Sequence, residues 1–128
     1  MRRPLAAASL LIVLAGCGGP RNTLNTSASA CFRGLPTATA AVGPKGRVVG
    51  VRTVARRVLA RDLPQADRIP ADVVCAVAYR GDFVPGDVAN ADPAGPGRFA
   101  VVALDTRGSH VVATFVVDTL PIPFHHRV

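Results

Sequence analysis

The chain has 128 residues and a formal net charge of +7 at pH 7, with 15 Lys and Arg against 8 Asp and Glu. This length allows one small domain and excludes a two-domain enzyme. Hydrophobic residues make up 49% of the chain and charged residues only 18%, so most of it has the composition of a folded protein. The absence of Trp and the single Tyr argue against an aromatic stacking surface for single-stranded nucleic acid.

The N-terminus has the features of an export signal. Met1-Arg2-Arg3 is a short positive segment, and residues 5–15 are uncharged and mostly apolar. A helix of that length rises only ~16 Å, about half of a ~30 Å hydrocarbon core, so it is too short for an ordinary membrane span. It fits the hydrophobic region of a signal peptide, and Arg2-Arg3 leaves the twin-arginine route open beside the general secretory one.

A cysteine follows the apolar segment directly, in the sequence Leu14-Ala15-Gly16-Cys17. This motif resembles the lipobox of bacterial lipoprotein precursors, which reads Leu, Ala or Ser, Gly or Ala, and Cys. The resemblance implies cleavage between Gly16 and Cys17 and attachment of acyl chains such as palmitate at Cys17. Two or more chains, at ~0.8 kcal/mol for each buried methylene, hold a protein firmly on a membrane. We therefore expect an exported protein anchored by lipid to the outer face of the bacterial cell membrane; a plain secretory signal is the alternative.

This interpretation divides the chain into three parts. Residues 1–16 form the cleaved signal peptide. Residues 17–30 are small and polar without a hydrophobic period, which is typical of a flexible tether. Residues 31–128 form a single small globular domain.

Two cysteines, Cys31 and Cys75, remain for the domain. In an oxidising envelope such a leftover pair favours a structural disulfide. A redox-active pair would require Cys-x-x-Cys spacing, which is absent, and a metal site would require more ligands. The sequence thus predicts a Cys31–Cys75 bridge.

The first half of the domain predicts one helix. Residues 34–46 are rich in Gly, Pro, Thr and Ala, with a turn expected near residues 43–46. Residues 47–51 fit a short strand or a lead into the helix. From Thr53, a plausible N-cap, apolar residues follow a helical period until Pro64 ends the element. The opposite face of this helix carries four arginines: Arg52, Arg56, Arg57 and Arg61.

The second half predicts three strands, over residues 72–80, 98–104 and 110–118, with a long loop at 81–97 and a hairpin turn at 105–109. On the first strand we assign one set of alternating side chains to the core: Val73, Cys75, Val77 and Tyr79. The Pro-containing tail after residue 118 is expected to be extended. The fold class is α+β, with one amphipathic helix packed on a small antiparallel sheet of three or four strands.

No set of residues matches a catalytic or metal-binding pattern. Ser109 and His110 are neighbours that point to opposite faces of a strand. His110, His125 and His126 lack zinc-site spacing. The aspartates of the long loop, Asp82, Asp87 and Asp92, lack the spacing of a calcium loop. We therefore predict no catalytic residues, no metal, no cofactor and no enzyme.

The arginine face is the one uneven charge feature. Like charges four residues apart on a helix repel each other, so Arg52, Arg56, Arg57 and Arg61 form a candidate contact face for an anion, either anionic lipid or an envelope polymer. A solvated face is the alternative, and nucleic acid is not expected outside the membrane. The first functional hypothesis is a non-catalytic binding or interaction module with an unidentified ligand. The second is a small envelope enzyme or accessory subunit with an unrecognised Asp/His site.

Overall fold

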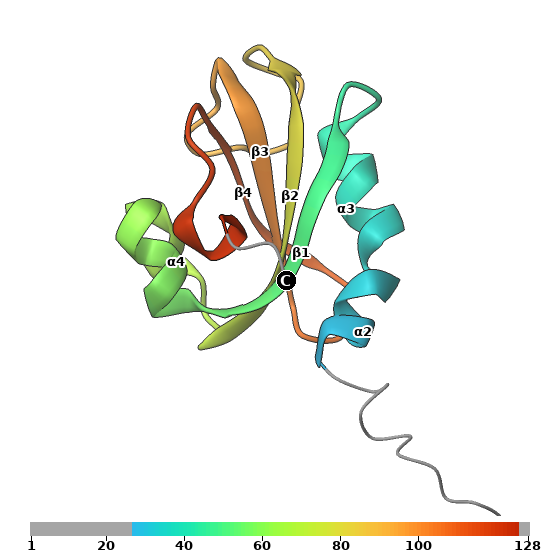
Figure 1. Ribbon diagram of the computed structural model, residues 1–128, viewed down its shortest axis with the longest axis vertical. Helices are drawn as coiled ribbons and strands as arrows, with labels where there is room; N and C mark the ends of the chain where they lie inside the picture. Colours follow the sequence, from blue (N-terminus) through green and yellow to red (C-terminus); the bar gives the residue numbers. More distant parts are fainter. Residues whose placement is uncertain (1–26, 126–128) are drawn as a thin grey trace, which may run out of the picture.

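The computed structural model describes residues 27–125, which form an α+β domain (Figure 1). Its elements in chain order are α2 (Ser27–Arg33), α3 (Leu35–Val42), β1 (Arg47–Ala55), α4 (Arg56–Asp62), the 3-10 helix η1 (Pro64–Arg68), β2 (Val73–Phe83), β3 (Gly97–Leu104), β4 (Val111–Val117) and the 3-10 helix η2 (Ile122–Phe124). The predicted class is confirmed, although the described residues contain three α-helices rather than one.

The four strands form one antiparallel sheet in the order β1-β2-β3-β4, so each strand pairs with its neighbour in the sequence. On β2, Val77 lies opposite Val51 of β1 and Val102 of β3. The three predicted strands are confirmed, with β2 continuing to Phe83 beyond its predicted end. The hairpin turn is also confirmed, since Asp105 pairs with His110 and Gly108 through backbone hydrogen bonds.

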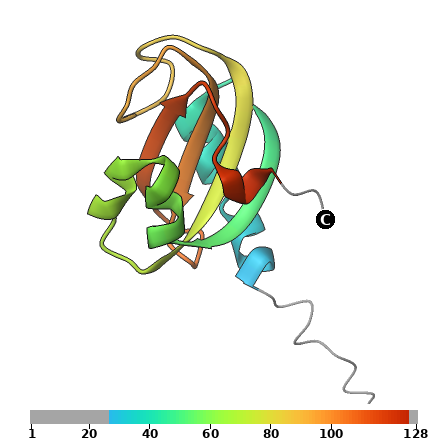
Figure 2. The same cartoon turned by 60° about the vertical axis from the view of Figure 1, so that its left-hand side comes forward.

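Helices cover both faces of this sheet. Figure 2 shows α4 and η2 on the near face, while α2 and α3 lie behind the sheet. As a result both sets of alternating side chains on β2 are buried: Cys75, Val77 and Tyr79 on one face, and Val74, Ala76 and Ala78 on the other. The assignment of a single core face was therefore incomplete, and Val73, which it included, is 41% exposed.

The first face, which we call the disulfide face, packs against α2 and α3. Cys31 of α2 and Cys75 of β2 form the predicted disulfide, with an S–S distance of 2.00 Å. Ala38 and Val42 of α3 are buried against the same strands. The hydroxyls of Thr39 and Tyr79 share a hydrogen bond of 2.9 Å, and the pKa of Tyr79 is raised by burial although the Thr39 bond opposes the shift.

The turn predicted near residues 43–46 is confirmed, but the sequence analysis missed α3, which occupies most of the segment before it. Its Pro36 stands in the first turn, where a proline costs no helical hydrogen bond. Gly43, with φ +82°, ends the helix. Pro36 and Gly43 thus lie at the two ends of the helix. The burial of its apolar residues stabilises the turns between them.

The predicted helix from Thr53 was wrong at its start. β1 continues through Ala55, where Thr53 pairs with Cys75 and Val54 with Val74. The backbone hydrogen bonds of this pairing outweigh the local helical period of the apolar residues. Helix α4 begins only at Arg56 and ends before Pro64, as expected. At the other end of the domain, α2 begins at Ser27, inside the segment expected to be tether.

The second face, which we call the α4 face, is covered only toward the end of the sheet that is lower in Figure 1. Apolar side chains of α4 and the segment after it pack on the sheet: Leu59, Leu63, Ala66 and Ile69. Phe124 of η2 packs on the same cluster, so the C-terminal tail is not extended throughout. The upper end of this face, where β1 begins, carries no helix (Figure 1).

Candidate anion-binding site

A basic row crosses the uncovered end of the α4 face. Strand pairing places Arg47 of β1 opposite Arg80 of β2, Arg80 opposite Phe99 of β3, and Phe99 opposite Val117 of β4. Residues that pair directly share one face of a sheet. Two arginines and a phenylalanine therefore lie side by side, and both arginines are exposed.

A hollow of about 300 Å³ opens beside this row. Its lining combines basic and apolar side chains from three strands and the tail: Val49, Gly50, Arg52, Arg80, Phe99, Leu120, Phe124 and His125. Gly50 is required for its floor, because a methyl group at this position would lie 2.7 Å from Cδ1 of Phe124. The ring of Phe124 thus rests directly on the β1 backbone.

The electrostatics of the site favour an anion. Arg47 and Arg80 are like charges in direct cross-strand register, an arrangement that costs stability when nothing compensates it. Within residues 27–125, neither forms an ion pair with a carboxylate. His125, at the rim, donates a hydrogen bond from Nε2 to the Leu120 carbonyl oxygen, which fixes its ring beside Leu120. A guanidinium presents a planar fork of N–H donors that matches a carboxylate or a phosphate.

The four arginines predicted to share one helix face do not share one. Arg52 lies on β1 and lines the hollow, whereas Arg57 and Arg61 are exposed on α4. The single arginine face was wrong because Arg52 precedes the start of the helix. Whether the α4 arginines contact an anion stays a prediction.

Arg56, the fourth of these arginines, has a structural role. Its Nη1 donates to the carbonyl oxygens of Asp67 at 3.2 Å and Ile69 at 3.3 Å, and its Nη2 lies 3.4 Å from the Asp72 carboxylate. These contacts connect the start of α4 to the segment that leads into β2. Arg56 therefore closes the lower end of the α4 face rather than presenting a free charge.

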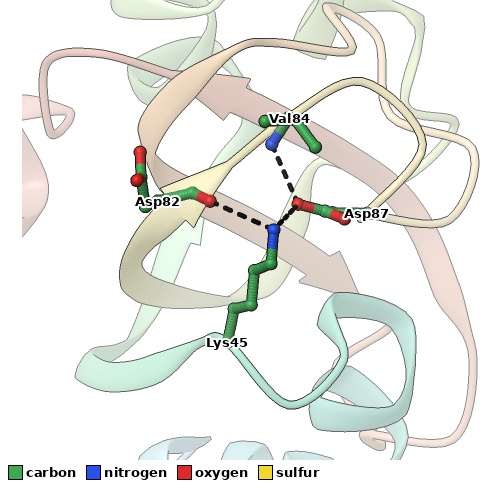
Figure 3. A network of polar contacts seen from close by, with 4 residues as sticks. All are labelled: Lys45, Asp82, Val84 and Asp87. Carbon is green, nitrogen blue, oxygen red and sulfur yellow. Dashed lines mark hydrogen bonds and ion pairs between the residues drawn. The ribbon is translucent and has the colours of Figure 1, made fainter.

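The aspartates of the predicted 81–97 loop have different surroundings, and the first of them, Asp82, belongs to β2. Lys45 lies 2.8 Å from the Asp87 carboxylate and donates to the backbone carbonyl of Asp82 at 3.5 Å (Figure 3). The same Asp87 oxygen accepts the Val84 N–H at 2.9 Å. The Lys45 hydrogen bond, helped by the Val84 N–H, lowers the pKa of Asp87. Asp92 contacts Arg68 instead, at 3.4 Å.

Asp105 is a turn residue. Its carboxylate accepts the backbone N–H groups of Ser109 at 2.7 Å and His110 at 3.3 Å, and chiefly the Ser109 bond lowers the pKa of Asp105. Ser109 and His110 thus meet the aspartate through their backbones. Among the described residues, no group of three or more His, Cys, Asp or Glu side chains is placed to hold a metal ion.

Sequence reasoning missed Arg47, Arg80 and Phe99 as site residues. One signal was present: Arg80 belongs to the alternating set of the first predicted strand that had not been assigned to the core. Without the pairing of β1 with β2, however, nothing in the sequence brings Arg47 and Arg80 together.

Cys17, the signal peptide, residues 17–26 of the tether and His126 lie outside the described residues. In the sequence, the family description "prokaryotic membrane lipoprotein lipid attachment site" matches residues 1–17. The chain is therefore a lipoprotein precursor with a lipobox, exported and anchored to the bacterial membrane. No curated protein and no solved structure matches the chain. Within residues 27–125, no helix has the length and apolar character to cross a membrane.

Proposed function

We propose that the domain is a non-catalytic binding module that takes an anionic ligand in the basic hollow of its α4 face. The observation that carries this proposal is the cross-strand pair Arg47–Arg80 beside the aromatic floor made by Phe99 and Phe124. The lipid on Cys17 would keep this module at the outer face of the cell membrane.

The hollow suits a small ligand that has one anionic group and one apolar group. Its volume of about 300 Å³ is at the lower limit of ordinary ligand pockets, which span roughly 300–1,000 Å³. The arginines would bind a carboxylate or a phosphate, and the phenylalanines would contact a ring or another apolar group. A free small molecule and the terminal group of an envelope polymer could both supply such an anionic group joined to an apolar one.

The position of the hollow favours an envelope ligand over the membrane to which the protein is attached. Arg47 begins β1, whereas α2, which follows the anchor segment, packs near the other end of that strand through Cys31 and Thr53. The hollow lies on the α4 face, whereas Cys31 of α2 packs on the disulfide face. The sheet itself therefore separates the hollow from the helix that follows the lipid anchor.

The test is a titration of the mature lipoprotein in neutral detergent micelles, followed by the NMR signals of the arginine side chains and the Gly50 amide. Phenyl phosphate should shift the signals of Arg80 and Gly50, with an affinity that weakens as salt is added. Inorganic phosphate should bind more weakly, because it makes no contact with Phe99 or Phe124.

Arg80→Gln should lower the affinity for phenyl phosphate, by about tenfold or more if one charged hydrogen bond of ~1.5 kcal/mol is lost. Arg98→Gln is the matched control, because Arg98 precedes Phe99 on β3 and thus points to the other face of the sheet. Equal losses in the two variants, or no response of Gly50 at any phenyl phosphate concentration, would contradict the proposal.

A further inference from the structure

An exposed aromatic residue lies at the end of the domain that follows the anchor segment. Phe32 of α2 is 55% exposed, the second highest exposure among the large hydrophobic residues of the described chain. Arg33 follows it and is also exposed. The preceding residue, Cys31, is fully buried in the disulfide, so α2 is held rigidly on the sheet while Phe32 and Arg33 stay on the surface.

The turn between β3 and β4 adds a second cation to this end. Figure 1 shows this turn beside α2, below the sheet. The packing is close, since a methyl group at Gly108 would lie 2.9 Å from both the Ala30 carbonyl oxygen and the Gly34 nitrogen. The neighbouring Arg107 is exposed.

One carboxylate, that of Asp105, lies close enough to Arg107 to interact with its charge. Asp105 is the acidic residue of the turn, and its carboxylate accepts two backbone N–H groups of that turn. In the described part of the chain, neither Arg33 nor Arg107 forms an ion pair. Phe32, Arg33 and Arg107 together are called the α2 patch below.

The anchor brings this patch close to a bilayer. Ten residue steps separate Cys17 from Ser27, and ten residues span at most about 36 Å even when fully extended. The α2 end therefore stays within that distance of the lipid on Cys17. Aromatic side chains and arginines are the residues that favour the headgroup region of a membrane, and cations near an anionic surface are attracted to it.

We propose that the α2 patch rests on the phospholipid headgroups of the membrane that holds the lipid anchor. In this orientation Phe32 enters the headgroup region and the two arginines lie over lipid phosphates. The hollow then lies on the opposite face of the sheet from α2. This surface is separate from the hollow, and its argument does not depend on the ligand proposed there.

The test uses the absence of tryptophan from this chain. Phe32→Trp supplies a single tryptophan in the mature lipoprotein, which is reconstituted in vesicles of phosphatidylcholine with and without phosphatidylglycerol. We expect the emission of the introduced tryptophan to be blue-shifted in these vesicles and to lose intensity when the lipids carry bromine near the headgroup. The matched control is Val84→Trp, since Val84 is 48% exposed in the loop after β2 and should show neither effect.

Two further variants separate contact with the membrane from contact with protein. Removing the cations with Arg33→Gln and Arg107→Gln should weaken the contact in phosphatidylglycerol vesicles about fivefold for each arginine, the equivalent of about 1 kcal/mol, and added salt should act in the same direction. Emission from the Phe32→Trp protein that brominated lipids leave unquenched would overturn the proposal. So would equal quenching of the Val84→Trp protein, because the α2 patch would then lie no nearer to the lipid than the loop after β2.

Discussion

The two faces of the sheet are covered in different ways. On the disulfide face, α2 and α3 lie along the strands and the bridge from Cys31 to Cys75 joins helix to sheet. On the α4 face, one short helix and two 3-10 turns cover the lower part, and the row of Arg47, Arg80 and Phe99 is left open. One face therefore supplies a closed core, and the other carries the open hollow for which we propose an anionic ligand.

The closed face should contribute most to stability. The largest expected effect comes from the double variant Cys31→Ala and Cys75→Ala, which releases a loop of 44 residues. The chain-entropy model gives a loss of up to about 4 kcal/mol in the free energy of unfolding. For a domain whose total is ~5–15 kcal/mol, urea unfolding should show a much lower midpoint.

The control is the unchanged protein with reductant, which should approach the same midpoint. A loss below about 1 kcal/mol would mean that α2 contributes little to the disulfide face, and the contrast between the faces would fail.

The stability of the lower part of the α4 face should depend on Arg56 but not on its neighbour Arg57. Arg56→Met removes hydrogen bonds to the carbonyls of Asp67 and Ile69 and should cost about 1 kcal/mol, because the side chain is partly exposed and its Asp72 partner is solvated. Arg57→Met should change the free energy of unfolding by only a few tenths of a kcal/mol. An equal loss in the free energy of unfolding from the two substitutions would contradict the structural role of Arg56.

The smallest expected effect lies at the Lys45–Asp87 contact, between the turn before β1 and the loop after β2. Because the pKa of Asp87 is lowered in the folded state, this contact stabilises the protein above the ordinary Asp pKa of ~3.9, and the contribution is lost as the pH falls through the lowered value. Lys45→Gln should lower the melting temperature slightly at about pH 7 and leave it unchanged at about pH 2. It should also raise the pKa of Asp87, as followed by NMR; an unaltered pKa would contradict the contact.

The parts of the fold that sequence reasoning predicted rest on local or chemical patterns. The alternation in β2, the turn chemistry before β4 and the pair of cysteines in an exported chain each carry their structural meaning in a few residues. The errors fall where a local pattern competes with a long-range contact. The segment around Thr53 fits a helical period, yet its pairing with Cys75 of β2 makes it a strand, and that partner lies in a distant part of the chain.

The residues of the candidate site could be predicted even less well from the sequence, because long-range pairing brings them together. Arg52 was selected from the sequence for a helix face, and it lies on a strand beside the hollow instead. Arg47 and Arg80 are far apart in the chain, and only antiparallel register makes them neighbours. The closure of the hollow by Phe124 likewise requires the tail to return to Gly50.

The sequence by itself determined where this protein goes, because the lipobox is a contiguous motif of four residues. The alternating apolar residues of β2, β3 and β4 also predicted these three strands from the sequence. Only the tertiary structure decided that both faces of the sheet are buried, that Arg56 closes one end of the α4 face, and that two arginines meet at the other. The physical reason is that strand pairing and helix packing are long-range: their free energy depends on surfaces that come together only in the folded chain.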